Sequence, residues 1–200
     1  MFIQIIQGRC IRRDDLRRLH ERWRQNLAPG ADGWLGATLG FTEDDQFVDV
    51  VRFESQDAAR ANAARPEQGA WAQELLALVD GPLEFHDCTD VTLLMGGGSD
   101  DAGFVQVIRG RVEDPARLRA MVADAVDRLH EARPEIIGGT LAIEADGTFT
   151  ETVAFTDEAS ARKGEQKDMP EDVRKTLEEA VSDVRYLDLQ DLWMASPGKA

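Results

Sequence analysis

The chain has 200 residues, of which 42% are hydrophobic and 30% are charged, so it can bury a substantial core. Its formal net charge is −15, which repels the phosphates of nucleic acids and of anionic membranes. We therefore expect no nucleic-acid partner and no membrane partner. The sequence shows neither a signal peptide nor an apolar run of the roughly 18 residues that a membrane span needs, and this favours a cytoplasmic protein.

The first half of the chain predicts the element order β-α-β-β-α-β. Alternating and β-branched residues indicate the strands, while apolar residues at helical spacing, ended by Gly and Pro, indicate the helices. The expected elements are a strand over 2–9, a helix capped by Asp14 or Asp15 and ending before Pro29, strands over 34–42 and 47–53, a helix capped by Ser55 or Asp57 and interrupted or restarted at Pro66, and a strand over 84–95.

The second half repeats the first at an offset of 102 residues. The segment from Phe2 to Arg9 returns as Phe104 to Arg111, and 17 of the 59 positions from residue 2 to 60 are identical in this register. A period of this length is a small domain, not a solenoid repeat. We predict a first unit over 1–95, a Gly/Ser/Asp linker over 96–103, a second unit over 104–194 and a frayed tail over 195–200.

This duplication predicts an α+β fold of two tandem ferredoxin-like units. The first strand is apolar on both faces, with Ile3 and Ile5 opposite Phe2 and Ile6. Helices cover one face of such a sheet, so the other face needs a second sheet. We expect the two units to pair within the chain as an intramolecular dimeric α+β barrel, a pseudo-dimer. The number of chains in any higher assembly stays open.

The sequence offers no pattern typical of a metal or cofactor site. His20, His86, His130, Cys10 and Cys88 show no metal-ligand spacing, and no phosphate-binding loop is present. We expect no metal, flavin or haem cofactor. Cys10 and Cys88 are interpreted as buried thiols, and a disulfide between them stays open.

Almost all of residues 2–95 resembles the antibiotic biosynthesis monooxygenase family of the dimeric α+β barrel superfamily. The matching segments are Gly33 to Gly36, Phe47 to Ser55, Ala58 to Asn62, Arg65-Pro66 with Ala70-Trp71, and Asp80 to Glu84. The chain departs from the family at Phe53, where many relatives have Trp, and at Asn62, where many have His. Haem degradation, a related activity, needs a His on the second helix, and none is present there.

The resemblance implies an oxidoreductase, a cofactor-independent monooxygenase acting on a small hydroxylated aromatic such as a quinol. The pocket would lie in the first unit. Asn62 would orient the substrate oxygen, and His86 is the best base on residue type. Trp34 and Trp71 would stack on the ring, and Arg9 would stabilise a phenolate.

Each of these residues also has a structural interpretation. Trp71 fits the buried apolar face of its helix, Trp34 fits a side chain that covers the edge of a strand, and Asn62 fits the end of a helix. His86 suits an exposed strand, and Arg9, which recurs as Arg111, suits a salt bridge. A non-catalytic barrel that binds a small apolar ligand or serves as an interaction scaffold is therefore the alternative function.

The two halves differ where a pocket would lie. Asn62, Trp34 and Trp71 correspond at the 102-residue offset to Gly164, Ile136 and Val173. Since one site can be lost when two share a chain, we expect any ligand to bind only the first unit.

Overall fold

The computed structural model describes residues 1–167, 175 and 179–198, and it divides into two compact units. Unit 1 consists of Met1–Thr89 with Leu189–Ala200, and unit 2 consists of Asp90–Asp188. The units thus differ from the two sequence repeats, because each repeat gives the end of its fourth strand to the other unit. The segment 96–103, predicted as a linker, falls within unit 2.

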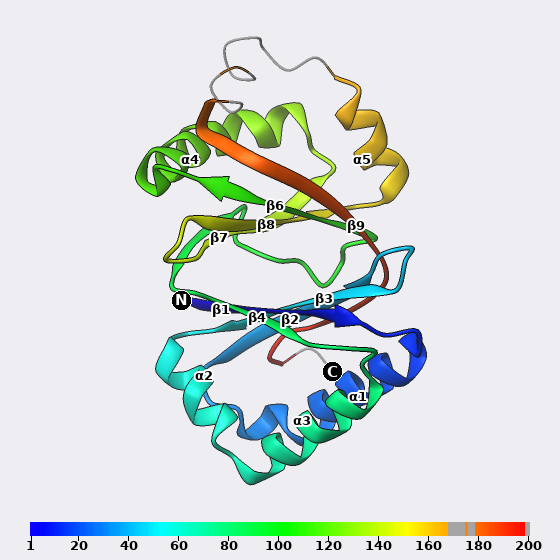
Figure 1. The fold of residues 1–200 in the computed structure, drawn as a ribbon. Helices are drawn as coiled ribbons and strands as arrows, with labels where there is room; N and C mark the ends of the chain where they lie inside the picture. Colours follow the sequence, from blue (N-terminus) through cyan, green and yellow to red (C-terminus); the bar gives the residue numbers. More distant parts are fainter. Residues whose placement is uncertain (168–174, 176–178, 199–200) are drawn as a thin grey trace. The chain divides into compact units, whose positions relative to one another are not determined.

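Unit 1 is an antiparallel sheet with helices on one face (Figure 1). Its strands follow the order β4-β1-β3-β2-β9. The elements are β1 (Phe2–Arg9), α1 (Arg13–Asn26), the short 3-10 helix η1 (Ala28–Gly30), β2 (Trp34–Phe41), β3 (Gln46–Phe53), α2 (Gln56–Ala63), α3 (Pro66–Leu78), β4 (Glu84–Cys88) and the last part of β9 (Val181–Ala195).

Unit 2 repeats this plan with the strand order β9-β6-β8-β7-β5. Its elements are β5 (Asp90–Leu94), β6 (Phe104–Val112), α4 (Pro115–Ala132), β7 (Ile136–Ile143), β8 (Thr148–Phe155), α5 (Glu158–Glu165) and the first part of β9. Val173, the counterpart of Trp71, lies outside the described residues. No helix in the described ranges is long and apolar enough to cross a membrane.

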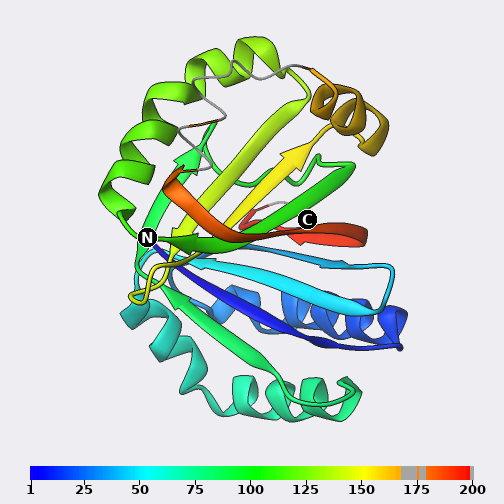
Figure 2. The ribbon, with the colours of Figure 1, turned by 45° about the horizontal axis from the view of Figure 1, so that its top comes forward.

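The expected α+β class is confirmed, and the described strands belong to one open antiparallel sheet that ends in β4 and β5. The strand predicted over 84–95 is split at Thr89. Its first part pairs with β1, as Ile5 with His86, and its second part pairs with β7, as Thr92 with Leu141. The corresponding β9 is one continuous strand, drawn orange to red in Figure 2.

Local signals explain where the helices of unit 1 begin. The predicted caps Asp14 and Asp15 lie inside the first turn of α1, where carboxylates favour the helix dipole without capping it. Ser55 does cap α2, since its hydroxyl accepts a hydrogen bond from the amide of Ala58 at 3.1 Å. Pro66 restarts the chain as the first residue of α3, a position that needs no amide donor.

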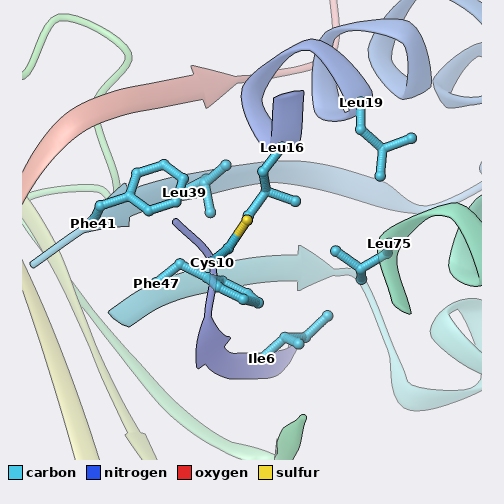
Figure 3. Close-up of a cluster of buried hydrophobic side chains, with 8 residues drawn as sticks. All are labelled: Ile6, Cys10, Leu16, Leu19, Leu39, Phe41, Phe47 and Leu75. Carbon is cyan, nitrogen blue, oxygen red and sulfur yellow. The ribbon is translucent and has the colours of Figure 1, made fainter. Parts of the chain in front are cut away.

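A cluster of apolar side chains joins the helices of unit 1 to its sheet (Figure 3). Its buried members are Ile6, Cys10, Leu16, Leu19, Leu39, Phe41, Phe47 and Leu75. Cys10 and Cys88 are both free and buried. Burial raises the pKa of the Cys10 thiol, which donates to the carbonyl of Leu78 at 3.3 Å. Both cysteines are thus buried thiols, as the sequence indicates.

Candidate functional site

Three neighbouring strands of unit 1 present alternate residues to the helices. In β3 these are Asp49, Val51 and Phe53, because successive side chains point to opposite faces of a strand. The strand register extends them into rows, which are Ile6–Asp49–Leu39, Gln4–Val51–Ala37 and Phe2–Phe53–Trp34. In β9, Trp193 lies beside Leu39 and lengthens the first row.

A cavity of about 150 Å³ is lined by this floor and by residues of α1, α2 and α3. All of its lining residues belong to unit 1. The chain has four tryptophans, and every one of them lines the cavity, namely Trp23, Trp34, Trp71 and Trp193. Aromatic side chains therefore form a large part of the cavity wall, which suits a flat ring.

A buried histidine–aspartate pair provides a polar centre in these walls. His20 of α1 and Asp49 of β3 are 4% and 3% exposed, and both line the cavity. The Nε2 atom of His20 lies 2.9 Å from Oδ2 of Asp49, and its Nδ1 atom lies 2.9 Å from the carbonyl oxygen of Leu16. The second carboxylate oxygen of Asp49, Oδ1, is buried and has no hydrogen-bond partner in the described structure.

Two tryptophans pack against the His20 ring. The rings of Trp71 and Trp193 each lie with their centroids 5.3 Å from that of His20, in edge-to-face geometry. The indole of Trp193 donates to Glu21 at 3.2 Å. Arg24 first, and then Trp193 and Gln25, lower the pKa of Glu21 to about 2, so this carboxylate stays ionised and fixes Trp193.

Three of the five predicted site residues line the cavity. Trp34 contributes a buried indole nitrogen that has no hydrogen-bond partner among the described residues, whereas the indole of Trp71 donates to the carbonyl of Leu19 at 3.2 Å. Asn62 is 7% exposed, and its amide oxygen accepts a hydrogen bond from Arg65 at 2.9 Å. One hydrogen bond to that oxygen is already made, so Asn62 can offer a ligand its NH₂ group and one remaining acceptor position.

The other two predicted residues, His86 and Arg9, are not among the lining residues. His86 pairs with Ile5 in the register, so it shares the face of Ile5, opposite that of Gln4 and Ile6. The Arg9 side chain is 56% exposed and its guanidinium lies 3.9 Å from Asp45. The structure therefore brings Asn62, Trp34 and Trp71 together and places His86 and Arg9 elsewhere.

The reasoning from sequence missed His20 and Asp49 as partners. A signal was present, because each interrupts an apolar pattern. His20 follows the buried Leu16 and Leu19 at helical spacing, and Asp49 lies within the apolar run from Phe47 to Val51. A polar residue on a buried face needs a partner. Within the described ranges no group of three or more His, Cys, Asp or Glu is placed to hold a metal ion.

Unit 2 differs at the corresponding positions. Val122 and Glu151 replace His20 and Asp49, and Ile136 replaces Trp34. At Gly164, which replaces Asn62, a side chain would collide with the ion pair of Arg133 and Glu135. The place taken by the Asn62 side chain in unit 1 is therefore filled in unit 2.

One polar pair is common to both units. Gln4 donates to Asp87 at 2.8 Å in unit 1, and Gln106 donates to Asp188 at 2.9 Å in unit 2. In unit 2, Arg162 also bonds Asp188 and lies over the Phe104 ring. Asp188 and then Glu165 raise the pKa of Arg162 above its usual value.

The corresponding arginine of unit 1 is arranged differently. Arg60 lines the cavity and its guanidinium lies 3.7 Å from the exposed carboxylate of Asp57 on its own helix. Arg162 of unit 2 thus bonds an aspartate of a strand, Asp188, whereas Arg60 of unit 1 pairs with an aspartate of its own helix, Asp57.

Comparisons with known proteins place this geometry among solved structures. Neither the family models nor the curated proteins searched match the sequence. A candidate monooxygenase from Fusobacterium nucleatum subsp. nucleatum is similar in structure, with a TM-score of 0.80, 12% identity, and coverage of 100% of this chain and 95% of that chain. An anthrone oxidase-like protein is also similar in structure, with a TM-score of 0.65 and 11% identity; the alignment covers 99% of this chain and 93% of that chain.

A ferredoxin-fold protein of Listeria monocytogenes 4b F2365, related to antibiotic biosynthesis monooxygenases, has a TM-score of 0.53 and 8% identity, and the alignment covers 95% of each chain. This chain has the fold of monooxygenase-like proteins. The expected resemblance is confirmed for the fold, including its ferredoxin-like character. Since the identities are so low, the chemistry rests on the residues of the cavity itself.

Proposed function

We propose that unit 1 is a cofactor-independent monooxygenase that acts on a small hydroxylated aromatic. The observation that carries this proposal is the cavity lined by all four tryptophans, in which His20 and Asp49 form a buried polar pair. Aromatic walls suit the ring of such a substrate, and the polar pair suits its hydroxyl group. The names of the similar structures, a candidate monooxygenase and an anthrone oxidase-like protein, agree with this chemistry.

The proposed reaction balances without a cofactor. Loss of the hydroxyl proton makes the ring electron-rich, and the substrate then reduces O₂ itself. At a ring carbon ortho or para to the hydroxyl group, the C–H bond is replaced by a C=O bond, and the C–OH group also becomes C=O, so that the phenol becomes a quinone. One oxygen atom enters the product, and the other leaves as water with the two hydrogens. The protein would hold the ring, accept the hydroxyl proton and exclude bulk water.

The experiment measures O₂ uptake by the purified protein with a panel of small hydroquinones and anthrone-like phenols. Turnover should fall at least about 100-fold in Asp49→Leu, because general base catalysis typically contributes 10²–10⁴-fold. Glu151→Leu, the same change at the repeated position of unit 2, is the matched control and should retain turnover. Equal losses in both variants would contradict a site in unit 1.

A non-catalytic binding protein is the second candidate. The observation that favours it is Asn62, whose amide oxygen is engaged by Arg65 and which cannot act as a base. This alternative predicts ligand binding in the same cavity with no O₂ uptake for any member of the panel.

We also propose that the two units pair as an intramolecular α+β barrel. The strand face opposite the helices of unit 1 carries Ile3, Ile5, Val48 and Val50, and an apolar sheet face needs a cover. The exchange of fourth-strand ends supports such pairing, because β4 and β5 are separated by Thr89 alone. Small-angle scattering that requires two independently moving units would contradict this arrangement.

A further inference from the structure

The hydrogen bonds of His20 limit where its protons can be. The carbonyl oxygen of Leu16, 2.9 Å from Nδ1, can only accept, so Nδ1 carries a proton. The other ring nitrogen, Nε2, lies 2.9 Å from Asp49. A single proton lies between Nε2 and Oδ2, whether it is bonded to the ring or to the carboxyl group. Both nitrogens of His20 are therefore engaged, and neither is free to meet a ligand.

Counting the hydrogen bonds of Asp49 in the same way leaves one of its two carboxylate oxygens without a donor. Its Oδ2 atom is engaged by His20, while Oδ1 is buried and has no partner in the described structure. A buried carboxylate oxygen that makes no hydrogen bond costs free energy, since it has lost its water. Because Asp49 lines the cavity and is 3% exposed, a ligand in the cavity is the group best placed to satisfy this atom.

We infer that the cavity recognises a single-ring aromatic through a neutral hydroxyl group, which donates its hydrogen bond to Oδ1 of Asp49. His20 is a positioning residue that holds the carboxylate through Oδ2. This assignment deepens the proposed function, on which it rests for its link to turnover, by naming the atom that meets the substrate hydroxyl and the size of the ring.

The size of the ligand follows from the volume of the cavity. An apolar protein cavity of about 150 Å³ holds one benzene molecule, as engineered cavities of that size show. The cavity of unit 1 has about this volume, so a single ring fits it. The four indoles among its lining residues suit the flat face and the edge of that ring.

The acceptor atom Oδ1 selects the protonated form of the hydroxyl. The titratable and charged residues that line the cavity are His20 from α1, Asp49 from β3, Asp87 from β4 and Arg60 from α2. His20 and Asp49 together carry no net charge in either position of their shared proton. The Oδ1 atom can accept a hydrogen bond from a neutral hydroxyl, whereas a phenolate oxygen has no proton to donate to it. The substrate would thus enter as the neutral phenol and pass its proton to Asp49 only after binding.

The test compares phenol with toluene, which has nearly the same shape but no donor. Binding to the whole protein is followed by NMR through the four indole N–H signals, all of which belong to cavity residues. The variant His20→Phe/Asp49→Leu replaces the buried polar pair by apolar residues, a change that proteins often tolerate. Glu151→Leu is the matched control in unit 2.

The preference for phenol over toluene should be at least about tenfold higher in the natural protein than in the double variant, the range expected for a hydrogen bond to a charged acceptor. Glu151→Leu should leave it unchanged. An equal preference in the natural protein and the double variant would overturn the inference.

A second measurement needs no variant, because phenol but not toluene should shift the His20 imidazole signals. Equal shifts with both ligands would also overturn the inference. No O₂ chemistry enters either measurement, so phenol selectivity without turnover would refute the monooxygenase proposal alone. Turnover without selectivity would refute the assignment of Asp49 alone.

Discussion

Glu151 makes unit 2 sensitive to pH in a way that one substitution can remove. It occupies in β8 the position that Asp49 has in β3, and its register partners are the apolar Ile108 and Leu141. The residue as a whole is half-buried, and burial deprives its carboxyl group of hydration. Loss of hydration raises the pKa of Glu151 to about 7.

The sign of the effect follows from this raised pKa. The unfolded chain releases the Glu151 proton near the ordinary value of 4.5, whereas the folded protein keeps it until about pH 7. Raising the pH through this window therefore favours the unfolded state. Between about pH 5 and about pH 8 the loss amounts to at most about 2.5 kcal/mol in the free energy of unfolding. Glu151→Leu cannot titrate and should lose that much less stability over the same interval.

The assay is urea unfolding of the natural protein and of Glu151→Leu at both pH values. Far-UV circular dichroism follows both units, whereas tryptophan fluorescence follows unit 1 alone, because all four tryptophans belong to it. The pH-dependent difference should thus appear in circular dichroism. A stability difference of the same size at both pH values would refute the reasoning, since it would show that the carboxyl group titrates alike in both states.

Two further pairs of substitutions use the repeat as their own control. Asn62→Gly should abolish binding of phenol in NMR titrations, because it removes a side chain that lines the cavity. Gly164→Asn should leave binding intact but lower the stability of unit 2, since Arg133 and Glu135 occupy the space beside Gly164. Unchanged binding of phenol in Asn62→Gly would contradict a role for this residue. Leu39→Ala and Leu141→Ala, at buried positions of the two repeats, should each cost about 3 kcal/mol. Because the proposed pairing couples the units, each change should shift the fluorescence and circular dichroism transitions together; a shift of circular dichroism alone in Leu141→Ala would contradict that pairing.

Sequence alone could predict the element types, because period-2 and helical spacing are local properties. It could not predict that the strand over 84–95 divides at Thr89 between two partners, since pairing with β1 and β7 is decided by tertiary contacts. The length of that strand was the available signal. It is longer than the eight-residue β1, and the excess has no partner within its own repeat.

The candidate site was predictable only in part for the same reason. Trp34, Trp71 and Asn62 fall in segments that resemble the family, and all three line the cavity. His86 was selected on its residue type, but the face of a strand depends on its register, which the sequence does not reveal. The pairing of His20 with Asp49 joins a helix to a strand 29 residues away, so it became visible only once both elements were placed.

The membership of β9 in unit 1 also has a consequence for synthesis on the ribosome. Trp193, which packs against His20, is made about 100 residues after Thr89, the last residue of the first part of unit 1. At about 5–20 residues per second, the nascent unit lacks this wall of its cavity for roughly 5–20 s. During that interval the edge of β2 has no β9 to pair with, and an unpaired edge is a place where chains aggregate. Chaperone demand should therefore be set by the translation rate of the second repeat, a segment that contributes no lining residue before Trp193.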